Sequence, residues 1–172
     1  MRVSVLTTET PHHLYFLREL RRRCSNVMTL DLVLLEERPF PYRRLFSRYA
    51  RAHWFNPIKA TVLNPYLNVP YTTDEQSRYE MERFFPNGDY GYDEGVRVES
   101  VRSVNGARAT ALLNEAAPDI LLVYGTGIVR PHVYNLPRIT SINCHGGFLP
   151  YYRGLDTNLW AVLKGEYDRM AL

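Results

Sequence analysis

Residues 139–154, which read ITSINCHGGFLPYYRG, place a short apolar run directly before a polar pair and a glycine turn. The run 139–142 has the length and composition of a buried strand. Because side chains alternate along a strand, Asn143 and His145 leave one face and Cys144 leaves the other. In open α/β sheets, ligands bind just beyond the carboxyl ends of the strands. This stretch therefore predicts a polar site at a strand tip.

The polar pair suits acyl transfer. The amide of Asn143 can donate to a carbonyl oxygen, and the imidazole of His145 can donate to an oxyanion or exchange a proton with an amine. The structural alternative is that both side chains only bond nearby backbone where the strand meets the loop, since buried polar groups need a partner. The residue types alone leave both possibilities open.

The rest of the chain alternates strands and helices, which predicts an α/β domain with a Rossmann-like open, mostly parallel sheet flanked by helices. We expect one domain over residues 1–172. Thr10 and Asn105 are the expected caps of two helices. Strands are expected at 2–6, 27–35, 96–101 and 120–124, and helices at 11–23, 74–85, 106–117 and 157–164.

The turn after the first expected strand has no Gly-x-Gly-x-x-Gly pattern. The close approach of backbone to a pyrophosphate that those glycines allow is therefore missing, which argues against a nicotinamide dehydrogenase. His12 and His13 stand in the first turn of the following helix. They could contact a substrate phosphate there, or they could face solvent or pack.

Residues 38–95 are expected to form a helical and irregular excursion within the domain. Arginines alternate with aromatic residues over 38–54 at helical spacing. An amphipathic helix packed on the sheet explains this pattern, and an anion-binding face for a nucleotide diphosphate is the alternative. Residues 56–73 contain three prolines and indicate an irregular segment.

Composition indicates an ordinary cytoplasmic domain. Hydrophobic residues make up 45% and charged residues 23% of the chain, and no stretch has the length of a signal peptide or a membrane span. Cys24 and Cys144 suggest neither a disulfide framework nor a metal site, and Cys144 is expected to be a packed core thiol. The net charge of +3 suits an anionic small molecule, and we expect no nucleic-acid partner.

The pattern Asn-x-His, a turn, Leu-Pro and then Tyr-Arg-Gly resembles the signature of the folate-dependent formyltransferases. The resemblance is specific over residues 116–167. It implies transfer of a formyl group from 10-formyltetrahydrofolate to an amine. Asn143 would hold the formyl oxygen, and His145 would stabilise the tetrahedral intermediate or shuttle its proton.

The same resemblance implies binding residues for both substrates. The acceptor would be a small-molecule amine, and a nucleotide-linked amino sugar is the first choice. The reason is that Gly146 and Gly147 stand where many members have Pro-Ser. Substrate contacts would come from Tyr152, Arg153 and Gly154. His12 and His13 are added to them because of their place at a helix N-terminus and not because of the resemblance. The folate pocket would be lined by Tyr124, Gly125, Thr126, Gly127, Ile128 and Val129.

The chain departs from the family pattern after the histidine. The family's catalytic aspartate has no counterpart here, since Asp156 is expected to cap a helix and Asp168 to lie in the next turn. The C-terminal strands of the family are also missing, so we expect a bare sheet edge and self-association. The alternatives are a formyl-folate hydrolase of the same fold and a truncated protein that binds folate or nucleotide without turnover.

Overall fold

The computed structural model describes residues 1–37, 74–152 and 157–170. Its strands are β1 (Arg2–Thr7), β2 (Thr29–Glu36), β3 (Arg97–Val101), β4 (Ile120–Tyr124) and β5 (Thr140–Cys144). Its helices are α1 (Pro11–Cys24), α4 (Asp74–Phe84), α5 (Ala107–Ala116), α6 (Pro131–Tyr134), α7 (Thr157–Leu163) and the 3₁₀ turn η1 (Tyr167–Arg169). The arginine-aromatic segment 38–54 and the irregular segment 56–73 lie outside the described residues.

The strands form one parallel sheet in the order β3-β2-β1-β4-β5. The chain builds outward from β1 to β3 and then crosses back to place β4 on the other side of β1. This reversal makes the carboxyl ends of β1 and β4 the switch point, where such sheets bind ligands. The predicted α/β fold is confirmed, and the tips of β4 and β5 lie side by side because these strands are neighbours.

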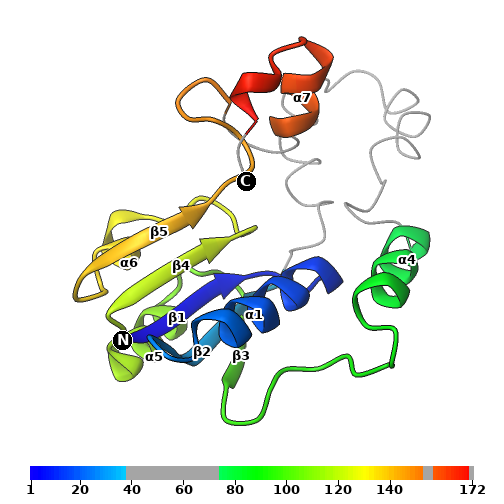
Figure 1. Cartoon of the computed structure of the whole chain (residues 1–172). Coiled ribbons are helices and arrows are strands. Elements are labelled where there is room, and N and C mark those ends of the chain that lie inside the picture. The colour runs from blue at the N-terminus through cyan, green and yellow to red at the C-terminus, as the bar shows by residue number, and fades with distance from the viewer. Residues whose placement is uncertain (38–73, 153–156, 171–172) are drawn as a thin grey trace, which may run out of the picture.

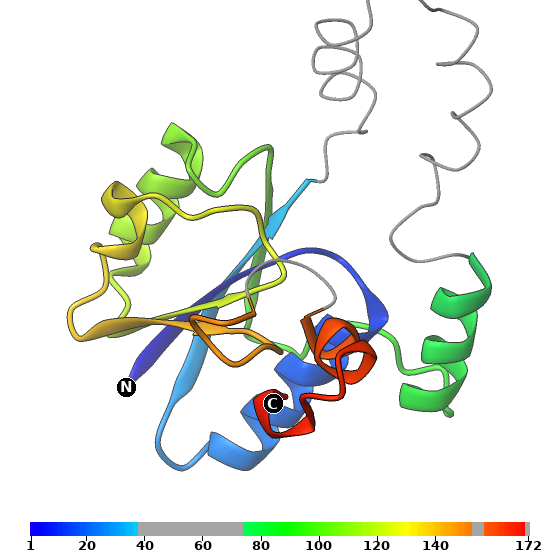
Figure 2. The ribbon, with the colours of Figure 1, turned by 90° about the horizontal axis from the view of Figure 1, so that it is seen from above.

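Helices cover both faces of the sheet (Figures 1 and 2), with α1 on one face and α5 with α6 on the other. Leu17 of α1 packs with Val5 and Leu122 in one cluster. Leu113 of α5 packs with Leu6 and Leu121 in the other. Burial on both faces explains the unbroken apolar runs at 32–35 in β2 and 120–123 in β4.

Of the two helix caps predicted from the sequence, one is confirmed and the other is wrong. Thr10 caps α1 as predicted, because its hydroxyl accepts the backbone N–H of His13 at 3.4 Å. The N-cap of α5 is Gly106, without a side-chain bond, so the predicted cap at Asn105 is wrong. The side chain of Asn105 instead reaches the loop after β4.

Candidate functional site

Asn143 and His145 lie at the carboxyl end of β5, next to the end of β4. Tyr124 pairs with Cys144 and Val123 pairs with Asn143 in the parallel register. Cys144 packs into the core cluster on the α1 face, so Asn143 faces the opposite side. Burial raises the pKa of the Cys144 thiol, which suits a packed thiol and not a nucleophile.

The Asn143 side chain is exposed, and within residues 1–37, 74–152 and 157–170 no group hydrogen-bonds its amide. Backbone bonding at the strand-loop junction therefore does not account for this residue in the described structure. An amide at this position has both its N–H donors and its carbonyl oxygen open to a ligand.

His145 is held through one ring nitrogen only. The backbone N–H of Gly147 donates to Nδ1 at 3.0 Å, which puts the proton of the neutral ring on Nε2. The carbonyl oxygen of Gly147 lies 3.1 Å from the same Nδ1 and could accept its proton in the charged ring. Within the described residues Nε2 has no partner, so it can donate to a ligand.

The turn after His145 needs its second glycine. A Cβ added at Gly147 would lie 2.5 Å from Cβ of Thr157 and 2.8 Å from Cβ of Tyr152. A Cβ at Gly146 would lie 3.2 Å from Nδ2 of the Asn158 side chain, which can move, and at an ordinary 3.8 Å from Oγ1 of Thr157. The absence of a side chain at Gly147 thus lets the turn close against the start of α7.

The loop from Tyr124 to Val129 is the predicted folate loop, and its members differ in exposure. Tyr124 is half-buried against His13 and Phe16, and burial raises the pKa of its phenol. Val129 packs against the α5-side core. Thr126 donates its hydroxyl to the carbonyl of Gly127, and Ile128 is 90% exposed. The exposed parts of this loop are therefore mainly backbone at Gly125 and Gly127, and the Ile128 side chain.

The two histidines of α1 lie in different surroundings. His13 is 4% exposed, its ring lies 4.3 Å from that of Tyr124, and its Nδ1–H donates to the Thr8 carbonyl at 2.9 Å. This is the packed alternative, and its burial leaves no open ring for a substrate phosphate. His12 is partly exposed and pairs with Glu80 of α4, with 2.8 Å between Nδ1 and Oε2.

The predicted acceptor residues after β5 are only partly described. Tyr152 is buried, and its hydroxyl donates to Oε2 of Glu166 at 2.7 Å. Burial and this bond raise the pKa of Tyr152, so its polar atom serves the contact between the turn and α7. Arg153, Gly154 and Asp156 lie outside the described residues.

Sequence reasoning missed two residues that touch the folate loop, Glu36 at the end of β2 and Asn105 before α5. A carboxylate oxygen of Glu36 accepts the N–H of Gly127 at 2.8 Å. The Asn105 amide donates to the Ile128 carbonyl at 2.8 Å. Glu36 also lines a cavity of about 190 Å³ at the strand ends, with Glu9 and Glu37 among its other lining residues. No local sequence signal marks these contacts, because they join segments far apart in the chain.

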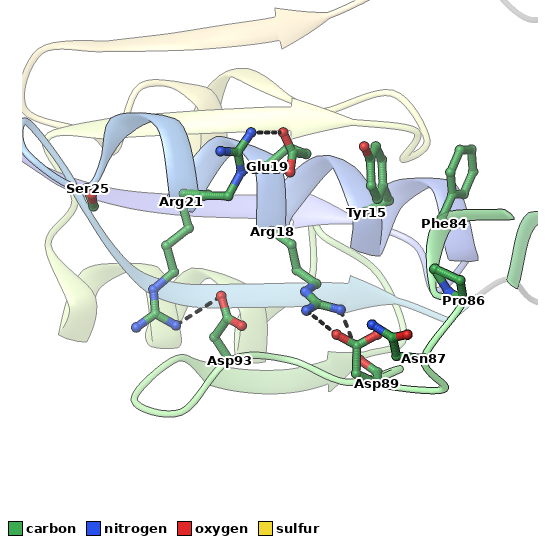
Figure 3. A pocket seen from close by; sticks show the side chains of 11 residues that line it. Tyr15, Arg18, Glu19, Arg21, Ser25, Phe84, Pro86, Asn87, Asp89 and Asp93 are labelled. Carbon is green, nitrogen blue, oxygen red and sulfur yellow. Dashed lines mark hydrogen bonds and ion pairs between the residues drawn. The ribbon is translucent and has the colours of Figure 1, made fainter. Parts of the chain in front are cut away.

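A larger groove of about 510 Å³ runs between α1 and the segment after α4 (Figure 3), away from the strand tips. Its charges are paired among themselves: Arg18 binds Asp89 at 2.7 Å and Arg21 binds Asp93 at 3.2 Å. Tyr15 stacks on Phe84 with 4.7 Å between ring centroids. These contacts join α1 to residues 84–93. The charges of Arg18 and Arg21 are both paired, so neither is open to an anionic ligand.

No metal cluster and no membrane helix occur in the part of the chain that the structure describes. No three or more His, Cys, Asp or Glu side chains gather there as metal ligands would. None of its helices is long and apolar enough to cross a bilayer.

The parallel sheet and the polar groups at its switch point define a Rossmann-like α/β protein with a candidate ligand site at the ends of β1, β4 and β5.

No family model matches the chain. Its sequence is 36% identical to a methionyl-tRNA formyltransferase of Microcystis aeruginosa over 117 residues, 64% of this chain and 36% of the relative. It is 33% identical to the enzyme of that name from Chlorobium chlorochromatii over 71 residues, 41% and 23% of the two chains.

Solved structures agree with the fold. Glycinamide ribonucleotide transformylase 1 from Symbiobacterium toebii superposes with a TM-score of 0.53 at 13% identity, covering 96% of this chain and 60% of that one. Phosphoribosylglycinamide formyltransferase from Anaplasma phagocytophilum gives a TM-score of 0.51 at 14% identity, with coverage of 95% and 58%. Part of the chain is therefore similar in sequence to methionyl-tRNA formyltransferases, and its fold is similar to that of these two transformylases. It spans about a quarter to a third of the length of these curated relatives.

Proposed function

We propose that this chain binds 10-formyltetrahydrofolate at the ends of β4 and β5 and passes its formyl group to an amine. The observation that carries this proposal is the pair of open donors at one strand tip, the Asn143 amide and Nε2 of His145. Both lack partners within the described residues, while Nδ1 of His145 is held by Gly147. A ring fixed at one nitrogen and open at the other is suited to donate to an oxyanion.

The reaction would proceed by addition and elimination. The amine lone pair attacks the formyl carbon, a C–N bond forms, and the carbonyl electrons move to oxygen. Asn143 and Nε2–H of His145 donate to this oxyanion. When the carbonyl re-forms, the bond from the formyl carbon to N10 of the folate breaks. One proton leaves the amine and one is gained by N10. In the charged ring, whose Nδ1–H would bond the Gly147 carbonyl, His145 would give its Nε2 proton to N10 and take the amine proton in its place.

The donor would lie along the loop 124–129, where Gly125 and Gly127 leave backbone exposed. The backbone N–H and C=O groups of this loop that Thr8, Glu36, Asn105 and Thr126 do not already bond can hydrogen-bond a flat heterocycle, and glycines allow its close approach. Tyr124 and Val129 support the loop from the core side. In this arrangement Ile128 offers the exposed apolar surface beside the donor.

For the acceptor we propose a nucleotide-linked amino sugar, supported by the net charge of +3 and by Gly146-Gly147 in place of Pro-Ser. His12, Arg153 and Gly154 remain the proposed contacts for it. Methionyl-tRNA is the alternative acceptor, favoured by the names of the sequence relatives. A cytoplasmic location belongs to this proposal, because both cysteines are free thiols.

Hydrolysis of the formyl donor is a second candidate, favoured by the exposure of Asn143, which lets water reach the reacting carbon. Binding of folate or nucleotide without turnover is the third. The experiment is to incubate the chain with 10-formyltetrahydrofolate alone, with an amino-sugar nucleotide, and with methionyl-tRNA, and to follow tetrahydrofolate release and formyl-amine formation.

Formyl transfer that falls by roughly 10²-fold or more in His145→Ala supports the proposed reaction. Release of tetrahydrofolate at the same rate with and without an amine assigns the hydrolase instead. Donor binding with no turnover in either variant leaves the binding protein. As a control for folding, Tyr79→Ala removes an exposed aromatic ring from α4, away from the tips of β4 and β5.

We also propose that the chain self-associates through β5. The two sheet edges differ in charge. On β3, Arg97 pairs with Glu99 and Glu115, and Arg108 pairs with Glu99. The edge strand β5 has no charged residue, and Ile142 is 45% exposed. An uncharged edge with an apolar side chain is the kind that pairs with another strand, and a second copy can pair with it about a twofold axis.

A further inference from the structure

The loop after β4 is held in place by a carboxylate from a distant strand. Glu36 ends β2, and its Oε2 accepts the backbone N–H of Gly127 at 2.8 Å. Its Oε1 accepts the backbone N–H of Val104 at 3.0 Å. One partly buried side chain thus joins the end of β2 to the loops that follow β3 and β4. Hydrogen bonds to a charged carboxylate are stronger than neutral ones, so this bridge is a firm one.

A second side chain holds the same loop from the other side. The Asn105 amide donates to the Ile128 carbonyl at 2.8 Å, and its oxygen accepts the N–H of Arg130 at 2.7 Å. With Glu36, it satisfies three backbone groups between Gly127 and Arg130. A short loop pinned at three backbone groups has few conformations left to it.

Neither residue is needed to complete a regular element. Asn105 is not the cap of α5, which begins after Gly106. Glu36 closes β2, and the ladder to β3 is complete through the backbone of Val101. Both side chains therefore bond the loop after β4, and Glu36 also ties it to the loop after β3. The loop after β4 starts at Tyr124, which pairs with Cys144 of β5.

We propose that Glu36 and Asn105 are positioning residues that set the shape of the loop 125–130 and thereby its affinity for the formyl donor. This inference rests on the proposed function, because it assigns the loop to the donor. Neither residue contacts the reacting atoms. Without either bridge the loop is less ordered in the free chain, so more conformational entropy is lost when the donor binds. The loss therefore weakens binding of the donor before it slows the chemical step.

The test uses Glu36→Gln and Asn105→Asp, with Glu37→Gln as the matched control. Glutamine keeps one side-chain oxygen as an acceptor but has an NH₂ group in place of the second. That group cannot accept a backbone N–H, so one of the two hydrogen bonds of Glu36 is lost. Asp at 105 keeps the acceptor for Arg130 and sets a carboxylate oxygen against the Ile128 carbonyl. Glu37 lines the same cavity as Glu36 and carries the same charge, but its side chain does not touch the loop.

Two quantities are measured on the 172-residue chain: hydrogen exchange of the Gly127 and Arg130 amides, and the Kd for 5-formyltetrahydrofolate as a stable probe. We expect Gly127 exchange to rise about tenfold or more in Glu36→Gln, with Kd weakened by about tenfold. Asn105→Asp should weaken Kd similarly, and Glu37→Gln should match the wild type. Exchange of the β1 amides, which should not change, reports that each variant is folded.

Unchanged Gly127 exchange and unchanged Kd in both loop variants would overturn the inference while leaving the proposed function intact. A wild-type chain that binds no formyl-folate would overturn the proposed function and the donor role of the loop together. Faster Gly127 exchange without any change in Kd would also overturn it, because the loop shape would then not govern donor binding.

Discussion

The ring of His13 fills the space that a Cβ at residue 125 would occupy. In that position the added carbon would lie 2.6 Å from Nε2 of His13. Gly125 also has a φ of +73°, in the left-handed region that favours glycine. The first turn of α1 and the end of β4 therefore meet at a site that admits no side chain at position 125. Thr8 completes the junction, since its hydroxyl donates to the Gly125 carbonyl at 3.4 Å.

Gly125→Ala should destabilise the chain and weaken donor binding. The methyl group meets the buried His13 and the backbone must adopt a left-handed conformation, so we expect a loss of ~2–4 kcal/mol in the free energy of unfolding. Gly127→Ala is the matched control, because its Cβ would lie 3.4 Å from Oε2 of Glu36 and its φ is not positive. Urea unfolding of both variants measures the difference, and equal stability of the two would contradict this account of the junction.

Gly147→Ala should be more harmful than Gly146→Ala. The first puts a methyl group against Thr157 and Tyr152, and overpacking of this kind costs ~1–3 kcal/mol. The second meets the movable end of Asn158 and should cost well under ~1 kcal/mol. Thermal unfolding followed by circular dichroism compares the two. A larger loss in Gly146→Ala would show that the turn is not packed as described.

The ion pairs of α1 should make stability depend on pH in the acid range. Hydrogen bonds from Arg22 and Arg23 lower the pKa of Glu19 to about 2. A carboxylate with a lowered folded-state pKa stabilises the fold above its unfolded value of about 4.3 and loses that effect as the pH falls toward 2. The contribution is small because the groups are exposed and are screened by salt.

Glu19→Gln should therefore lower the Tm by about 1–2 °C at pH 6, and this difference should shrink as the pH falls from 4.5 to 2. The control Glu82→Gln removes one exposed charge from α4. Thermal scans at low salt provide the measurement. A Tm difference that persists at pH 2 would mean that Glu19 acts through packing and not through its charge.

The β5 edge can be tested by adding charge to it. Ile142→Lys places a cation on the strand, as natural edge strands do to prevent pairing. Sedimentation velocity of the wild type should show dimers that increase with concentration, and the variant should shift toward monomer. Tyr79→Lys, at an exposed site on α4, adds the same charge elsewhere and should leave the dimer unchanged. A wild type that remains monomeric at high concentration would rule out this association.

The sequence predicted most elements because their signals are local. Thr10 and Pro11 mark the start of α1, and the alternation around Cys144 correctly separates it from the face of Asn143. Contacts between segments far apart in the chain could not be predicted from these local signals. The burial of His13 depends on Gly125, more than a hundred positions along the chain, and the bridge from Glu36 to Gly127 is similarly distant. The strand order could not be derived either, because the residue pattern of a strand does not say which strands are its neighbours.

Asn105 shows why local signals also mislead. An Asn before an alanine-rich segment is a good helix cap by its chemistry. In the structure its amide bonds Ile128 and Arg130 instead, because the loop after β4 lies within reach and needs partners for its backbone. Long-range hydrogen bonds thus determine the position of a side chain that the local sequence predicts to be a helix cap.

An NMR titration of the ¹⁵N-labelled chain with 5-formyltetrahydrofolate would show where the formyl donor binds. The account predicts chemical-shift changes in the amides of 125–130 and 143–147, with weaker binding in Asn143→Ala and His145→Ala. Resonances of the α1 groove, at Arg18, Arg21 and Asp89, should stay in place. Shifts confined to that groove, or no shifts at the tips of β4 and β5 at saturating ligand, would contradict it.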